Sequence, residues 1–406
     1  MPARQRQPEN HQLPTGRRIF DQNCNSARAK IKNSLKSLPI TSPKSGNRYL
    51  DAVLSTILPA DFFQSEKPFS VDKSVPLHKG KMQMCIEPVT LTPSTKTLSK
   101  EQIFFIQHHR MVSISCGTSK DILLALSKEV VDIIDNFKLI LHLNDDFTRN
   151  ESIVWGMDIF EFLPNIQHIN ILCFRYEELK HIEGLAYIHN LQSFSIDGNL
   201  KSKMDFSVLR KFRKLLNLSI NGTILNEKYY DIINQNNLNQ LSLRKIHLSY
   251  LTPQFDLSQL EIIHDLVDAE EMGILFPNIR HLSIANCRKL KDFNFISSLH
   301  HLEQLYMNTV SGLAVLPEIL ADSLHTLQLV NCKNLYDIHS IYSLQNLKRL
   351  ALTYSKVNPE ELGKILSHLA LENFYFESDK YKINEQFRKL AAKYQVESHM
   401  LYNQRN

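Results

Sequence analysis

The sequence predicts an α/β solenoid in which short units, each with one strand and one return segment, stack side by side. An internal duplication and a short apolar period carry this prediction. Residues 282–305 and 327–350 are two copies of one pattern, offset by 45 positions, so that Leu282 maps onto Leu327. Each copy spans two units of about half that length, and a fixed period in this range is typical of solenoids.

The unit reads apolar-x-x-apolar-x-apolar and recurs ten times, with a mean spacing of about 23 residues. Because side chains alternate along a strand, the second and third apolar positions point inward together, and the residues flanking them face out. The first apolar positions of the ten units are Ile166, Leu191, Leu215, Leu238, Leu257, Ile279, Leu302, Leu324, Leu347 and Leu371.

This pattern resembles the leucine-rich repeat, whose consensus is L-x-x-L-x-L-x-x-N/C-x-L within roughly 20–29 residues. The resemblance covers roughly residues 160–380, in ten units that agree in register. It implies a curved parallel β-sheet on the concave side of the solenoid and short helices or turns on the convex side.

The ninth motif position, where this family stacks an Asn or Cys, is only partly kept. Asn199, Cys287 and Cys332 fit, Thr223 and Ser355 are weaker substitutes, and Phe174, Ile246 and Val310 do not fit. We therefore expect irregular units around residues 246–275, with an acidic helix at residues 265–272 (DLVDAEEM) in the return segment.

A solenoid needs a cap at each end, because its open ends would expose the core. Residues 49–160 are predicted to form an α/β region ending in a βαβ cap, ahead of repeats at residues 161–380 and a closing helix within residues 381–406. The expected cap elements are a short helix at 49–63, a strand at 111–116, a helix from Asp121 capped by Thr118 or Ser119, and a strand at 139–143. The apolar stripe of the closing helix is Ile383, Phe387, Leu390, Ala391 and Tyr394.

Charge is concentrated in residues 1–48, which carry ten Lys/Arg against Glu9 and Asp21. This leader is also rich in Pro, Ser, Asn and Gln, which predicts disorder. A basic segment can touch nucleic acid or an anionic membrane, but this one lacks stacking aromatic residues and a dense basic run, so a solvated leader is favoured. It also lacks the apolar segment of a Sec-type signal peptide, and no stretch of the chain is apolar enough to span a membrane.

Candidate chemistry is sparse. Residues 116–120 (CGTSK) lie at a predicted strand-to-helix turn, but the spacing of a phosphate loop or a cysteine phosphatase is missing, so an ordinary capped turn is favoured. The His108-His109-Arg110 run has no second cluster at metal-ligand spacing. We expect no catalytic residue, no cofactor and no metal. The six cysteines are scattered without a C-x-x-C pair, which favours free thiols in a reducing compartment.

The outward strand positions form the candidate binding surface. Those before the second apolar position are polar in all ten units, and only Arg349 among them has a fixed charge. Such a surface suits a protein or peptide, because nucleic acid would require many Lys/Arg contacts. The candidate partner-binding residues are His168, Gln240, His281, Gln304, Tyr306, Gln328, Arg349 and Tyr375.

The predicted function is a non-enzymatic protein-interaction scaffold. The irregular repeats, the Lys/Asn/Ile-rich composition and the distinct amino-terminal region resemble leucine-rich-repeat effectors of intracellular bacterial pathogens. That resemblance implies a cytoplasmic protein, or one delivered into the host cytosol by a Sec-independent route. The alternative is an enzyme with its catalytic site in residues 49–160 and the repeats as substrate-recognition module. The sequence predicts neither the partner nor the oligomeric state.

Overall fold

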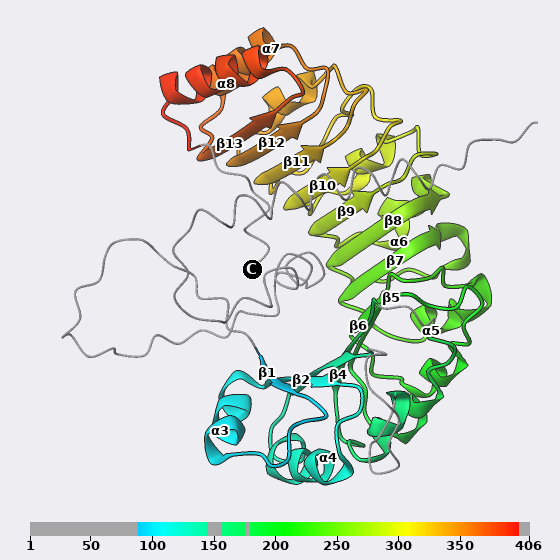
Figure 1. The fold of residues 1–406 in the computed structure, drawn as a ribbon. Helices are drawn as coiled ribbons and strands as arrows, with labels where there is room; N and C mark the ends of the chain where they lie inside the picture. The colour runs from blue at the N-terminus through cyan, green and yellow to red at the C-terminus, as the bar shows by residue number, and fades with distance from the viewer. Residues whose placement is uncertain (1–87, 144–155, 175–178, 398–406) are drawn as a thin grey trace, which may run out of the picture. The chain divides into compact units, whose positions relative to one another are not determined.

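The protein is described here by a computed structural model, which covers residues 88–143, 156–174 and 179–397. These residues contain one parallel sheet of 13 strands, and each strand pairs with its neighbours in chain order. The strands line the concave side of the curved array, and the return segments lie on its other side (Figure 1). The predicted leucine-rich-repeat solenoid is confirmed. The predicted basic leader and the helix at 49–63 lie outside the described residues.

The strands are short, as the repeat requires, except in the middle of the sheet. In chain order they are β1 (Val89–Leu91), β2 (Met111–Ser115), β3 (Lys138–His142), β4 (His168–Cys173), β5 (Ser193–Gly198), β6 (Asn217–Ile220), β7 (Gln240–His247), β8 (Gln259–Val267), β9 (His281–Ala285), β10 (Gln304–Asn308), β11 (Thr326–Val330), β12 (Arg349–Thr353) and β13 (Asn373–Glu377).

Helices are short in the return segments and longer at the ends of the described solenoid. The α-helices are α3 (Lys100–His109), α4 (Lys120–Leu126), α5 (Asp231–Asn234), α6 (Met272–Leu275), α7 (Pro359–His368) and α8 (Tyr381–Lys393). Most other return segments contain a single 3-10 turn, such as Asn294–Ser298 and His339–Ser343. None of the helices in the described ranges is long and apolar enough to cross a membrane.

The register predicted from the sequence is confirmed throughout the repeats. Leu282 pairs with Leu305, Leu305 with Leu327 and Leu327 with Leu350, so equivalent positions of successive units form rows across the sheet. All ten first apolar positions are buried, as are both inward positions of every unit except the half-buried Phe376. The core is therefore one continuous stack of apolar layers running the length of the sheet.

The amino-terminal cap extends the same sheet, because β3 pairs with β4 in register from Lys138↔His168 onward. Its helix α4 begins where the sequence predicted. Of the two candidate caps, Ser119 accepts the Ile122 N–H at 3.4 Å, while the Thr118 hydroxyl donates to the Ser115 carbonyl at 2.9 Å. The cap thus covers the first repeat by adding strands to it.

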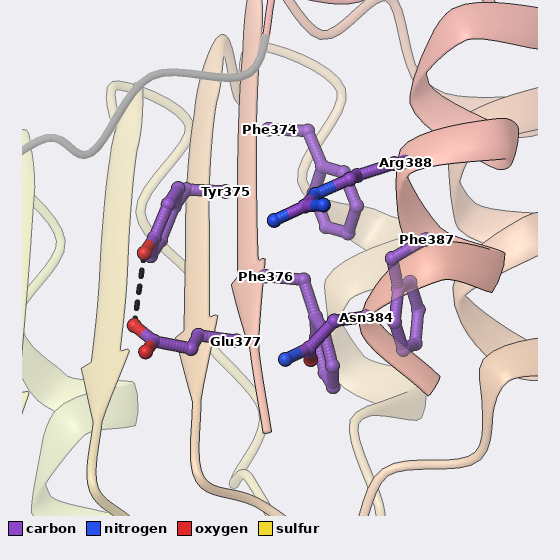
Figure 2. A pocket seen from close by; sticks show the side chains of 7 residues that line it. All are labelled: Phe374, Tyr375, Phe376, Glu377, Asn384, Phe387 and Arg388. Atoms are coloured by element: carbon purple, nitrogen blue, oxygen red, sulfur yellow. Dashed lines mark hydrogen bonds between the residues drawn. The ribbon is translucent and has the colours of Figure 1, made fainter. Parts of the chain in front are cut away.

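Helix α8 packs against β13 and buries Phe387 and Ala391 from the apolar stripe predicted for the closing helix. The Phe387 ring lies 3.5 Å from the Phe376 ring and 6.3 Å from the Phe374 ring, measured between centroids. Figure 2 shows these aromatic rings between β13 and the helix. Residues 398–406, the end of the predicted closing segment, lie outside the described residues.

The predicted acidic helix at 265–272 is wrong in its first half. Asp265, Leu266 and Val267 belong to β8, and they continue its ladder with β7 beyond a register shift after Leu243. Leu266 is buried there, so strand pairing and burial prevail over local helix propensity. A 3-10 turn begins only at Ala269, and α6 follows it. The irregularity predicted for this part of the repeats is therefore a bulged, lengthened strand pair.

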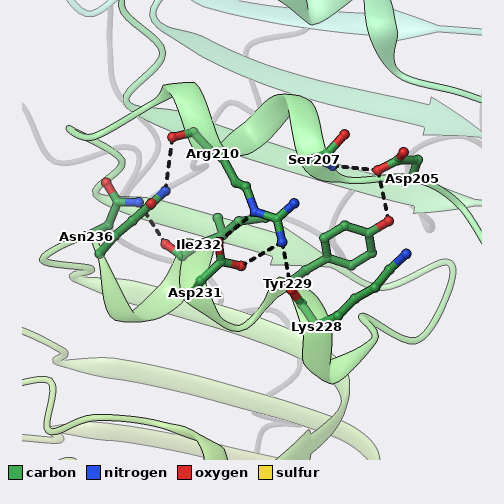
Figure 3. Close-up of polar contacts among 9 residues, drawn as sticks. Asp205, Ser207, Arg210, Lys228, Tyr229, Asp231, Ile232 and Asn236 are labelled. Atoms are coloured by element: carbon green, nitrogen blue, oxygen red, sulfur yellow. Dashed lines mark hydrogen bonds and ion pairs between the residues drawn. The ribbon is translucent and has the colours of Figure 1, made fainter.

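On the other side of the sheet, side chains of adjacent return segments are linked by polar contacts (Figure 3). Arg210 Nε lies 2.6 Å from Asp231 Oδ2, and the guanidinium stacks over the Tyr229 ring at 5.3 Å. Tyr229 in turn donates to Asp205 Oδ1 at 2.8 Å. The ion pair is about half exposed, so these contacts orient neighbouring units more than they stabilise the fold.

Candidate partner-binding face

The concave face of the sheet is built from three rows of side chains that alternate with the inward apolar positions. Row A precedes the inward pair, row B lies between its two members, and row C follows it. Because the strands pair in register, each row crosses the sheet with a step of roughly 4.8 Å per strand. Row A includes Gln240, Gln259, His281, Gln304, Thr326 and Arg349, and row B includes Ser242, Glu261, Ser283, Tyr306, Gln328 and Tyr375.

Seven of the eight predicted partner-binding residues lie together on this face. Gln240, His281, Gln304, Tyr306, Gln328, Arg349 and Tyr375 come from β7 to β13, and each is partly exposed. Tyr306 and Tyr375 stand three strands apart in row B, roughly 14 Å by strand spacing. The exception is His168 on β4, which is 9% exposed and lies three strands from Gln240. A buried imidazole does not present itself to a partner, so the predicted residues that are exposed on this face come from β7 to β13.

Row C was missed by the sequence reasoning, which stopped at the last apolar position of each unit. It contributes polar residues of its own, Asp197, Asn221, Arg244, Asn308 and Glu377, all partly exposed. Burial raises the pKa of Asp197, while the Gly198 N–H and the Arg244 charge oppose that shift. Extending the alternation by one residue beyond each inward pair would have found this row.

A chain of hydrogen bonds ties β6, β7 and β8 together on this face. The Ser242 hydroxyl lies 2.9 Å from Asn221 Oδ1 and 2.9 Å from Glu261 Oε2. Asn221 also donates through Nδ2 to the Ser219 hydroxyl at 3.2 Å. These contacts fix the orientation of an amide and a carboxylate before any partner arrives.

A second group of polar contacts lies at β12 and β13. The hydroxyls of Tyr354 and Tyr375 donate to the two carboxylate oxygens of Glu377, each at 2.8 Å. Burial and the bond to Glu377 raise the pKa of Tyr375 to about 12. Figure 2 shows the Tyr375–Glu377 pair on one side of β13. The bond to Glu377 therefore holds the Tyr375 ring in one orientation, as a rigid contact surface.

Charged groups cluster where β9 to β12 begin. Glu303 pairs with Arg280 at 2.8 Å and approaches His281 Nε2 at 3.7 Å. Arg349 Nη2 lies 3.4 Å from His325 Nδ1, and burial, together with the Arg349 charge, lowers the pKa of His325. Positive and negative groups therefore lie side by side next to row A, at the starts of these strands. Such a mixed patch suits a polar partner more than a uniformly charged one.

The described residues contain no group of three or more His, Cys, Asp or Glu side chains arranged to hold a metal ion. At the CGTSK turn, Cys116 and Thr118 are both buried. Within the described ranges, the concave face is the surface that collects the predicted site residues.

Neither a protein-family model nor a curated protein matches the chain. Solved structures that resemble it include an internalin (inlF) of Listeria monocytogenes, with 15% sequence identity and a TM-score of 0.38, covering 67% of this chain and 88% of that one. An internalin C2 (inlC2) of the same organism has 15% identity and a TM-score of 0.31, covering 56% and 87%. A leucine-rich-repeat protein of Leptospira interrogans has 18% identity and a TM-score of 0.36, covering 75% and 93%.

The class of the protein follows from its own chain, because ten repeat units lie in register on one parallel sheet. It is a leucine-rich-repeat solenoid.

Proposed function

We propose that the protein is a non-enzymatic interaction scaffold that binds a protein or peptide partner on the concave face of β7–β13. The observation that supports this proposal is the gathering of seven partly exposed predicted residues on one continuous face. Tyrosine and arginine, which dominate interface hot spots, stand among amides and hydroxyls there. Tyr375 is held by its bond to Glu377 of the same strand, and Ser242 bonds to Asn221 and Glu261 of the neighbouring strands. Such contacts reduce the ordering cost of binding.

A protein partner fits the charges of this face better than nucleic acid does. Between β7 and β13, the outward positions carry Arg244, Lys245 and Arg349 against Glu261, Asp265 and Glu377. Nucleic acid binding depends on many Lys/Arg contacts to phosphates, and this balanced set does not supply them. A partner with exposed hydroxyl, amide and aromatic groups can instead exchange hydrogen bonds with rows A, B and C.

We also propose that the partner is a host-cell protein and that the chain acts as a bacterial effector in a reducing cytosol. The irregular repeats and the Lys/Asn/Ile-rich composition support this origin. The free cysteines agree with a reducing compartment, and in the described part of the chain they are all buried: Cys116, Cys173, Cys287 and Cys332. The full chain, used as bait in host-cell lysate, should capture one protein that mass spectrometry identifies. The whole chain is the right bait because β1–β3 continue the sheet of the repeats.

The double substitution Tyr306→Ala with Arg349→Ala tests the proposed face. It should weaken binding of the captured partner by at least ~2 kcal/mol, or about 30-fold, and leave the melting temperature unchanged. The matched control is Tyr336→Ala with Arg288→Ala, which removes the same residue types from exposed positions outside the strands. Full affinity in the first variant would contradict the proposed face, and a chemical activity retained by residues 1–160 would contradict the non-enzymatic assignment.

A further inference from the structure

The side chains of His325 and Arg349 meet at the starts of β11 and β12. Arg349 pairs in register with Thr326, and His325 directly precedes that residue. Arg349 Nη2 lies 3.4 Å from His325 Nδ1, and the Thr326 hydroxyl oxygen lies 2.8 Å from the same ring nitrogen. The orientation of the Arg349 guanidinium is therefore tied to the state of one imidazole.

This contact requires the neutral form of the imidazole. A guanidinium has hydrogen-bond donors and no acceptor, so Nδ1 must accept, and the ring proton of His325 must then lie on Nε2. Protonation adds a second N–H, at Nδ1, which points toward the Arg349 guanidinium. Two positive charges would then face each other at 3.4 Å, so the guanidinium must move away from the ring.

The surroundings keep His325 neutral at pH 7. Burial, followed by the Arg349 charge, lowers the pKa of His325 below 6.5. Histidine is the side chain whose charge ordinarily changes between about pH 5 and pH 8, whereas arginine stays charged throughout that range. A modest acidification therefore changes the charge of the ring and leaves that of the guanidinium as it is.

Three further titratable or charged side chains face His325. The Glu303 charge raises the pKa of His325, whereas the charges of His281 and Lys348 lower it. Glu303 also bonds to Arg280 at 2.8 Å, and its second oxygen lies 3.7 Å from His281 Nε2. Glu303 is thus shared among several cations, so it does not by itself neutralise a protonated His325.

We propose that the charge of His325 controls binding on the concave face: the neutral ring holds Arg349 in position for the partner, and protonation in an acidic compartment displaces the guanidinium and releases the partner. This inference rests on the proposed function, since Arg349 belongs to the proposed binding face. A partner that needs the neutral ring must in turn lower the pKa of His325 when it binds. Affinity is therefore highest at neutral pH and falls as the pH drops below 6.5.

The first experiment is a histidine titration of the full chain, followed by NMR of imidazole groups labelled with carbon-13. The His325 signal is identified by its absence in His325→Gln. We expect it to titrate below pH 6.5 in the parent and at a higher pH in Arg349→Gln, which removes the facing charge. The matched control Arg213→Gln removes an exposed arginine ahead of β6 and should leave the His325 titration unchanged. An unchanged titration in Arg349→Gln would overturn the proposal.

The second experiment captures the partner from host-cell lysate on a series of concentrations of the immobilised full chain, at about pH 7.5 and about pH 5.5. We expect roughly tenfold weaker apparent affinity at the lower pH, the change that one pKa unit corresponds to. His325→Gln keeps a hydrogen-bond acceptor but cannot be protonated, so it should bind equally at both pH values. The control His300→Gln, at an exposed turn position, should show the parental loss. Equal losses in the parent and in His325→Gln, or tighter capture at the lower pH, would contradict acid release.

The two experiments separate failure of this inference from failure of the proposed function. Capture of no protein, or full affinity in the Tyr306→Ala, Arg349→Ala double variant, would overturn the proposed function and this inference with it, even where the titration shows the contact between His325 and Arg349. A double variant that loses affinity, with parental capture equal at both pH values, would leave the binding face in place and overturn acid release alone.

Discussion

The thiols of Cys287 and Cys332 lie inside the turns that follow β9 and β11. Each lies 3.6 Å from a carbonyl oxygen two residues earlier, and both side chains are fully buried. Burial raises the pKa of Cys287 to about 12 and that of Cys332 to about 11. Since the thiolate is the reactive form, both groups are chemically quiet in the folded protein.

The first prediction at this scale follows from that burial. Iodoacetamide at neutral pH should leave Cys287 and Cys332 unmodified in buffer and modify both in urea, as read by peptide-resolved mass spectrometry. Rapid modification of both in buffer would show that these turns face outward.

His168 gives a second residue-scale prediction. Burial, with the Lys138 charge as the smaller cause, lowers the pKa of His168 from 6.5 to about 4. The unfolded chain therefore binds this proton first as the pH falls. The stabilising contribution is complete above pH 6.5 and is lost as the pH falls from 6.5 to about 4.

The urea midpoint should accordingly drop between pH 7 and pH 5, and it should drop less in His168→Gln. The control is His300→Gln, at an exposed turn position, which should keep the full decline. Equal declines in both variants would assign the acid sensitivity to other groups.

At the scale of the element, register is set by burial. A strand shifted by one residue would move every inward side chain of its unit to the concave face. Leu327 and Leu329 on β11 are fully buried, while Gln328 between them is partly exposed, so the shifted pairing would expose two leucines and bury an amide. The strands are short, but this difference selects one register.

Leu327→Ala should lower the free energy of unfolding by ~2–5 kcal/mol, because it leaves a cavity in a packed layer. The neighbouring control Gln328→Ala should change it by less than ~0.5 kcal/mol. Denaturant midpoints measured by circular dichroism provide the comparison. A parental midpoint for Leu327→Ala would contradict the assigned register.

The sequence was most informative where one interaction dominates. The first apolar positions from Ile166 to Leu371 predicted the register of ten strands, because a strand shifted by one residue would not bury its apolar side chains. It failed at residues 265–267, which join a strand because the ladder from Lys245↔Asp265 onward continues past the bulge. It also missed row C and the burial of His168, since both depend on how neighbouring units extend or cover each strand.

At the scale of the whole molecule, stability spreads from unit to unit, because each repeat contacts mainly its neighbours. The final unit has a repeat on only one side, and α8 supplies the other. Phe387, 2% exposed and stacked on Phe376, is the central contact of that closure. The end of the solenoid therefore depends on one aromatic pair more than the interior depends on any single contact.

Phe387→Ala should accordingly open the molecule from this end. Hydrogen exchange followed by mass spectrometry should accelerate first in β13 and β12, with β7 and β8 unchanged. The control Tyr381→Ala, an exposed aromatic on the same helix, should leave all four strands protected. Uniform acceleration across the sheet would instead indicate one cooperative unit.

The 45-residue duplication has an evolutionary consequence. Its two copies place equivalent positions in the same rows of the sheet, with Ser283 of the first copy matching Gln328 of the second in row B. A further tandem copy inserted between them would add two strands, or roughly 10 Å of concave face, and would leave both caps untouched. A lineage could therefore change the reach of this surface by unequal recombination, and then refine its chemistry by substitutions at outward positions that the core does not constrain.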